Sequence, residues 1–237
     1  MKLHKNYYYF FIIFFFGIIF IFIFILETID HNCYSIGLRH EIVDYLKGRL
    51  VFEKRISSDK AANSLDETTI LYTLGGNQGS LLQRYLIASE LYHSGLSKKI
   101  MILSRPGITE FDSILGRNLT NDEWSIRELR SLNVKQKDIE LVSVNIGYLG
   151  TFREAMRVMD INRERGGGRI ILVTSSYHTR RVFLAFSAFQ MDLPGEIYVY
   201  GSVDSPKMIT IISETVKLFL YENFLLPALS TFRVKSS

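Results

Sequence analysis

The sequence predicts an α/β protein with a three-layer, Rossmann-like, mainly parallel sheet and helices on both faces, preceded by one N-terminal transmembrane helix. From Thr68 onward, short β-rich runs alternate with amphipathic segments, as in strand–helix–strand crossovers. The run 169–173 is nearly all apolar, which is typical of a strand covered on both faces. Residues 7–26 carry no charge, and twenty such residues are enough to cross a bilayer.

The charges that flank this apolar run predict its orientation. Lys2 and Lys5 precede it, whereas Glu27 and Asp30 follow it, so the positive-inside rule places the N-terminus in the cytoplasm. We therefore expect a single-pass protein of the plasma (inner) membrane with its domain on the extracytoplasmic side. The alternative is a cleaved signal peptide, but its apolar core is shorter, about 7–15 residues, and no Ala-x-Ala cleavage pattern follows here.

Composition excludes several classes of function. The net charge is +4, and the sequence has no long block of Lys and Arg residues, so nucleic-acid binding is not expected. The one cysteine, Cys33, cannot form an internal disulfide, and the histidines lack the spacing of a metal site. We expect neither a metal nor a cofactor, and protein partners stay open.

Each expected element has a local reason. The first strand ends at Gly75–Gly76, and the helix after it, with an apolar side from Leu81 to Leu91, stops at Gly95. Thr120-x-x-Glu123 has the spacing of a capping box. The glycines 166–168 follow a helix and precede a strand, which indicates a helix stop. The expected strands are 69–74, 99–103, 139–142, 169–173 and 197–200, and the expected helices are 36–56, 80–93, 120–132, 151–165, 177–190 and 209–224.

These elements divide the chain into five parts. The parts are a cytoplasmic N-terminus (1–6), the anchor (7–26), a helical linker (27–67), the α/β domain (68–226) and a C-terminal tail (227–237).

The turn after the first strand is a candidate anion site. Gly75, Gly76 and Asn77 lead from strand to helix, where backbone N–H groups can approach an anion. Arg84, one turn into the helix, could clamp a phosphate or carboxylate. The structural alternatives are a tight turn and a solvated arginine, and for Arg84 alone the solvated position is favoured.

The sharpest cluster follows the fourth strand. Thr174 and Ser175 can cap a helix or bind a ligand oxygen, and Arg180 and Arg181 add positive charge. His178 lies in the first helical turn, where the helix dipole lowers the imidazole pKa and favours a neutral general base. A structural histidine under a loop is the alternative.

Two further pairs have a sufficient structural explanation. Thr151 and Glu154 have capping-box spacing, as Thr120 and Glu123 do, so any role in a site is an addition.

In order and spacing, these segments resemble the YdcF/SanA-like family of envelope-associated proteins, over roughly residues 68–224. The matching pieces are Leu74-Gly75-Gly76, Arg84-x3-Ala88-x2-Leu91-Tyr92-x2-Gly95, the strand ending at Ser104, Glu123, Gly150-Thr151-x2-Glu154-Ala155 and Val173-Thr174-Ser175-x-Tyr177-His178-x-Arg180-Arg181. The resemblance implies a Rossmann-like domain of unknown function and a role in the envelope, with a peptidoglycan precursor or lipid-carrier intermediate as ligand.

The chain departs from the family pattern after the second strand. Ser104-Arg105-Pro106-Gly107 replaces Ser-Gly-Gly, and an insertion, 108–118, follows. Glu110 or Asp112 could therefore take the place of Glu123.

Three functions follow as hypotheses. The first is an enzyme or binder of an anionic envelope metabolite, with His178 and Glu154 as catalytic residues. Its ligand-binding set is Gly75, Gly76, Asn77, Arg84, Ser104, Glu123, Thr151, Thr174, Ser175, Arg180 and Arg181. The second is a non-catalytic scaffold acting through its anchor. The third, a nucleotide or S-adenosylmethionine binder, lacks the glycine fingerprint and an acid after the second strand.

Overall fold

The computed structural model describes residues 17, 35–57, 68–144, 150–190 and 193–229. Apart from Gly17, the expected anchor lies outside them, as does most of the C-terminal tail. Within the described ranges, no helix has the length and apolar character needed to span a bilayer. The chain divides into two units, 1–45 and 46–237. Helix α2 (Ser35–Leu50) runs across that boundary.

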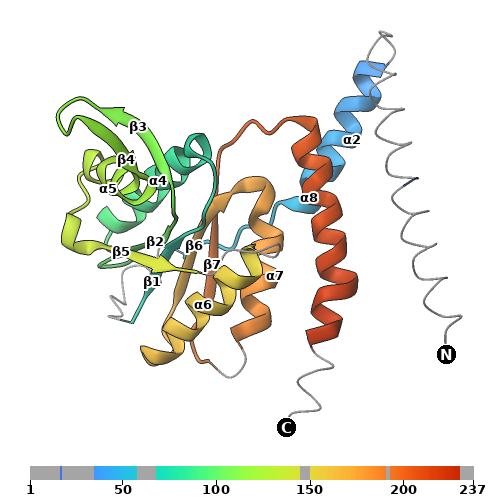
Figure 1. Ribbon diagram of the computed structural model, residues 1–237. Helices are drawn as coiled ribbons and strands as arrows, with labels where there is room; N and C mark the ends of the chain where they lie inside the picture. Colours follow the sequence, from blue (N-terminus) through green and yellow to red (C-terminus); the bar gives the residue numbers. More distant parts are fainter. Residues whose placement is uncertain (1–16, 18–34, 58–67, 145–149, 191–192, 230–237) are drawn as a thin grey trace, which may run out of the picture. The chain divides into compact units, whose positions relative to one another are not determined.

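The second unit is built on a five-stranded sheet in the order β5-β2-β1-β6-β7 (Figure 1). Each neighbouring pair is parallel, with Tyr72 opposite Met101 on one side and opposite Leu172 on the other. The expected α/β fold with a mainly parallel sheet is therefore confirmed. The strands are β1 (Ile70–Thr73), β2 (Ile100–Ser104), β5 (Ile139–Ser143), β6 (Ile170–Ser175) and β7 (Ile197–Ser202).

Helices cover both faces because successive strand residues point to opposite sides. Leu71 packs with α4 (Gln78–His93) and α5 (Asn121–Ser131) in one apolar cluster. Its neighbour Tyr72 packs with α6 (Gly150–Glu164) and α7 (Thr179–Gln190) in the other. The result is three layers, helix–sheet–helix (Figure 1).

The strand order creates a switch point between β1 and β6. The chain leaves β1 through α4 toward β2 and β5 on one side, then crosses through α6 to β6 and β7 on the other. The crossovers therefore lie on opposite faces, and a crevice opens beyond the carboxyl ends of β1 and β6. The segments after Thr73 and Val173, which are register partners, meet at this crevice.

The remaining elements complete the unit. Two 3-10 turns are η2 (Gln136–Asp138) and η3 (Ser176–His178). The closing helix α8 (Met208–Leu220) continues into a π-helical turn, η4 (Tyr221–Leu225). The helix expected over 36–56 ends at Leu50, and residues 51–56 extend along β7 instead. Lys54 forms an antiparallel bridge with Val199, and the Ile56 N–H donates to the Tyr200 hydroxyl.

Two other expectations about this fold are wrong. On α4, Leu82 and Leu86 are 40% and 42% exposed, while Leu81, Arg84 and Tyr85 are buried. The helix therefore faces the sheet through a stripe that includes a charged residue. The insertion 108–118, for which no element was expected, contributes most of an antiparallel hairpin of β3 (Ile108–Asp112) and β4 (Arg117–Thr120).

Two capping predictions are confirmed. Thr120 and Glu123 form the reciprocal capping box at the start of α5. Gly166 and Gly167 have φ of +94° and +78°, and the Gly167 N–H donates to the Asn162 carbonyl, which ends α6.

Candidate functional site

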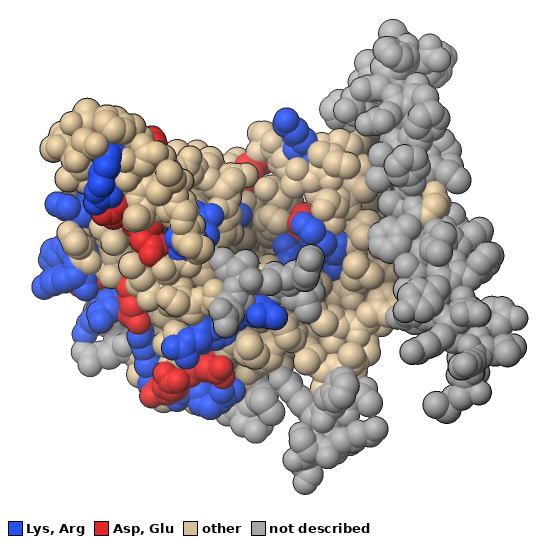
Figure 2. Space-filling model, in the orientation of Figure 1, with Lys and Arg blue, Asp and Glu red and all other residues tan. Residues whose placement is uncertain are grey.

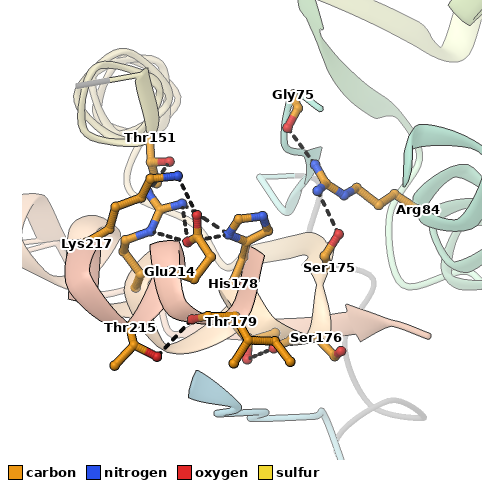
Figure 3. Close-up of polar contacts among 12 residues, drawn as sticks. Gly75, Arg84, Thr151, Ser175, Ser176, His178, Thr179, Glu214, Thr215 and Lys217 are labelled. Atoms are coloured by element: carbon orange, nitrogen blue, oxygen red, sulfur yellow. Dashed lines mark hydrogen bonds and ion pairs between the residues drawn. The ribbon is translucent and has the colours of Figure 1, made fainter. Parts of the chain in front are cut away.

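Arg84 joins the ends of β1 and β6. Its Nη1 donates to the carbonyl oxygens of Leu74 at 2.9 Å and Gly75 at 2.5 Å, and its Nη2 donates to Ser175 Oγ at 2.8 Å (Figure 3). The residue is 2% exposed, so the favoured expectation of a solvated arginine is wrong. Since both terminal nitrogens bind atoms of the chain itself, Arg84 holds the glycine turn in place.

The glycine turn is too crowded for side chains. A Cβ on Gly75 would lie 2.5 Å from Leu103 Cδ2, and one on Gly76 would lie 2.6 Å from Ser80 Oγ. Asn77 is the N-cap of α4 and accepts from the Ser80 N–H at 2.9 Å. The turn therefore packs closely against its neighbours, which agrees with the tight turn considered as the structural alternative, although neither Gly75 nor Gly76 has a positive φ.

Asp122 is the acid beside the second strand. It accepts from Ser104 Oγ at 2.6 Å and from the Arg105 N–H at 3.0 Å, and the Arg105 guanidinium donates to the Gly76 carbonyl. Asp122 thus connects the end of β2 to the start of α5, and Arg105 connects that end to the glycine turn. Its position next to Glu123 in the first turn of α5 was the available sequence signal.

The three other acids considered for this position bind elsewhere. Glu123 is in the capping box and forms an ion pair with Arg117, whose hydrogen bonds, with that of the Thr120 N–H, lower the pKa of Glu123 to about 2. Glu110 pairs with Arg127. Asp112 accepts the N–H groups of Ile114 and Leu115 in the hairpin turn.

Glu154 lies beneath the glycine turn. Its Oε2 accepts from the Tyr72 hydroxyl at 2.7 Å and from the Gly75 N–H at 3.1 Å. Because α6 begins at Gly150, Thr151 is already inside the helix, and the expected capping box with Glu154 is wrong. Burial raises the pKa of Glu154, and the hydrogen bonds from Tyr72 and Gly75 oppose that rise.

His178 is fixed by a buried carboxylate. Its Nδ1 lies 2.7 Å from Glu214 Oε2, on α8 (Figure 3). Burial lowers the pKa of His178 although Glu214 opposes it, so the imidazole is neutral at neutral pH. The direction agrees with the sequence prediction, but burial is the main cause. Nδ1 also lies 3.1 Å from Arg181 Nη2. We assign the ring proton to Nδ1 because the carboxylate, at the shorter distance, has none to give, and this leaves Nε2 as an acceptor.

Glu214 is the hub of the cluster and was missed from the sequence. Arg181 Nε donates to its Oε2 at 2.9 Å, and Lys217 Nζ donates to its Oε1 at 2.6 Å. Burial raises the pKa of Glu214, but the His178 hydrogen bond and the Arg181 charge outweigh it and lower the pKa to about 2. The available signal was a lone acid on the stripe Ile211–Glu214–Leu218 of an apolar helix.

Of the remaining candidates, some join this cluster and some do not. Arg181 Nη1 donates to Thr151 Oγ1 at 2.7 Å, which brings Thr151 to the site. Arg180 instead forms an ion pair with Glu222 at 3.1 Å and is 38% exposed at its side chain. Thr174 is buried within β6, and Ser175 is occupied by Arg84 rather than capping a helix.

A pocket of about 560 Å³ opens beside Glu214, and Figure 2 shows a hollow in this face with basic and acidic atoms beside it. Its volume is in the range of ligand sites. The lining residues are Gly150, Thr151, Glu154, Arg181, Lys217, Leu220, Tyr221, Phe224 and Leu225.

The described ranges contain no group of three or more His, Cys, Asp or Glu residues that could hold a metal ion. A scan against protein-family models and a search of curated proteins both return no match for this chain.

Proposed function

We propose that this protein binds an anionic metabolite in the crevice at the carboxyl ends of β1 and β6, and that His178 acts on it as a general base. The observation that carries the proposal is an imidazole fixed at Nδ1 by Glu214, with Nε2 directed away from that carboxylate, toward the side of Gly75 and Arg84 (Figure 3).

The charges around His178 favour an anion. Arg181 and Lys217 both bind the single carboxylate of Glu214, so this part of the cluster carries an excess of one positive charge while the imidazole is neutral. Arg84, whose charge also acts on His178, adds to the positive potential. A phosphate or carboxylate placed here would accept charge-assisted hydrogen bonds.

The Nε2 lone pair can take a proton from a water or hydroxyl group held next to the anion. The resulting imidazolium would be stabilised by Glu214, the relation of base and orienting acid found in hydrolytic sites. Glu154 supports the crevice from below through the Gly75 N–H. Its role in this proposal is to position the turn.

The resemblance noted above supports an envelope ligand such as a peptidoglycan precursor or a lipid-carrier intermediate. The uncharged run 7–26 supports a membrane-anchored protein whose domain is on the extracytoplasmic side.

Pyrophosphate titration of the full-length protein tests the anion site. We expect wild type to bind, and Lys217→Gln to bind at least about tenfold more weakly because a charge-assisted contact is lost. Lys135→Gln, which removes an exposed charge outside the pocket lining, is the control and should match wild type.

Histidine-labelled NMR of the same samples provides a second readout. The Nε2 of His178 should have the shift of an unprotonated nitrogen at neutral pH and should move on adding pyrophosphate. Equal affinities for wild type and Lys217→Gln, with an unmoved His178 signal, would refute the proposal.

A further inference from the structure

The pocket beside the cluster has two chemically different walls. The polar wall comes from α6, α7 and α8, and the apolar wall comes from the end of α8 and from η4. The polar residues are Thr151, Glu154, Arg181 and Lys217, and the apolar ones are Leu220, Tyr221, Phe224 and Leu225.

We propose that the ligand is an amphiphile, with an anionic head such as a phosphate monoester on the polar wall and an aliphatic chain on the apolar wall. This inference rests on the proposed function, because Arg181 and Lys217 of the polar wall belong to the Glu214 cluster that the anion site uses.

The apolar wall is exposed in the protein alone. Phe224 is 50% and Leu220 is 40% exposed, although both line a concave site. Large apolar side chains gathered in a pocket are unfavourable in water, and an aliphatic chain that covers them is stabilised by the area it removes from solvent.

The two walls meet along one side of the closing helix. Lys217, Leu220, Tyr221 and Phe224 have the spacing i, i+3, i+4 and i+7, which places them on the same side. A head at Lys217 and a chain reaching Phe224 would span about 10 Å. The helix therefore presents a charge and then a line of apolar side chains, in the order of an amphiphile.

Two local features connect the head site to the chain site. The guanidinium of Arg181 lies over the Tyr221 ring, 5.6 Å from its centroid, so the cation of the polar wall contacts the first ring of the apolar wall. The wall then continues through the π-helical turn η4, a rare geometry that is frequent at functional sites.

The charge on the polar wall specifies the head. Lys217 keeps 51% of its side chain exposed while bonded to Glu214 Oε1, so it can bind a second anion without leaving the first. An alcohol head would accept hydrogen bonds from Arg181 and Lys217 without the attraction between opposite charges, and a cationic head would be repelled by both. An anionic head complements both.

A chain-length series tests the inference. Full-length protein in zwitterionic nanodiscs is titrated with methyl, butyl, hexyl and octyl phosphate, with empty discs as the blank. We expect affinity to rise by up to about fourfold per methylene while the chain covers the apolar wall. Phe224→Ser should flatten the series and leave methyl phosphate unchanged. Ile209→Ser is the control, because Ile209 is exposed on the same helix and outside the pocket lining.

The outcomes separate this inference from the proposed function. If wild type binds all four phosphates equally, the chain site is refuted and the anion site stands. If wild type binds none of them, both fail. A second disc preparation containing phosphatidic acid identifies the source: loss of octyl phosphate binding there indicates that a membrane lipid occupies the pocket, and unchanged binding indicates a free amphiphile.

Discussion

Two arginines at the same rim of the sheet have different environments. Arg84 is 2% exposed, and its terminal nitrogens bind the carbonyls of Leu74 and Gly75 and the hydroxyl of Ser175. Arg181 lines the pocket and binds Glu214 and Thr151. The chain supplies acceptors for both guanidinium groups, and the difference lies in what is beside them: Arg84 is enclosed by the chain, whereas Arg181 borders a cavity that a ligand could fill.

Nearby acids favour the charged form of Arg84 although the residue is buried. Burial lowers the pKa of Arg84, and the charges of Asp204 and Glu154 act in the opposite direction. Asp204 follows β7 and accepts from Ser202 Oγ at 3.1 Å. Two acids from different elements therefore help to keep Arg84 charged.

Replacing Arg84 should remove the contacts that join the ends of β1 and β6, and should have the largest effect on stability. In Arg84→Met, two carbonyls and the Ser175 hydroxyl lose their donor, so we expect the free energy of unfolding to fall by about 4 kcal/mol. Urea unfolding followed by the fluorescence of buried Trp124 measures this. Arg163→Met, at an exposed pair with Asp160, is the control and should change stability by less than about 0.5 kcal/mol. Similar small losses for both would show that Arg84 is dispensable.

Removing the carboxylate of Glu214, which binds Arg181, should have the second largest effect on stability. The pKa of Glu214 is about 2, below 4.5, so its stabilisation is present above pH 4.5 and is lost as pH falls toward 2. Glu214→Gln should therefore lower the free energy of unfolding by about 3 kcal/mol at neutral pH and have little effect near pH 2.

Glu154→Gln is the matched variant with the opposite sign. The pKa of Glu154 is raised, so its contribution is present below pH 4.5 and is lost as pH rises through the folded value. Glutamine still accepts from Tyr72 and Gly75. The free energy of unfolding of Glu154→Gln, relative to that of wild type, should therefore be higher at neutral pH than in acid. Unfolding curves over the acid-to-neutral range test both, and parallel profiles for the two variants would contradict the assignment.

A methyl group in the turn should produce a smaller effect. In Gly76→Ala, Cβ would lie 2.6 Å from Ser80 Oγ and 2.9 Å from Arg84 Nη1, so we expect a loss of about 2 kcal/mol. Gly79→Ala is the control on the same segment: its Cβ meets Asn77 Oδ1 at 3.7 Å, and we expect a gain of about 0.5 kcal/mol. Thermal unfolding distinguishes the two, and equal melting temperatures would show that the turn can yield.

The alternation of strands and helices could be predicted because it is a local property of the sequence. The runs around Leu71 and Leu172 are apolar and short, and glycines mark their ends. The crevice also followed, since parallel strands with crossovers on both faces gather their carboxyl ends. The expected start of a helix lay within a few residues of the observed start where a capping residue such as Thr120 was present.

The partners inside the crevice could not be predicted, because they depend on contacts between distant residues. The burial of Arg84 requires Ser175, 91 positions away, and the orientation of His178 requires Glu214, 36 positions away. No motif links those pairs. Asp122 was passed over for its neighbour because the capping-box spacing identified Glu123, and spacing alone does not show which acid faces β2.

Residues 51–56 have a consequence for self-association. Strand β7 ends the sheet order, so its outer backbone groups could recruit a strand from another chain. Lys54 and Val199 exchange two backbone hydrogen bonds, at 2.9 and 3.2 Å, so the outer N–H and C=O groups of Val199, in the middle of β7, are already paired. The segment that leads in from α2 thereby protects the domain against edge-to-edge aggregation.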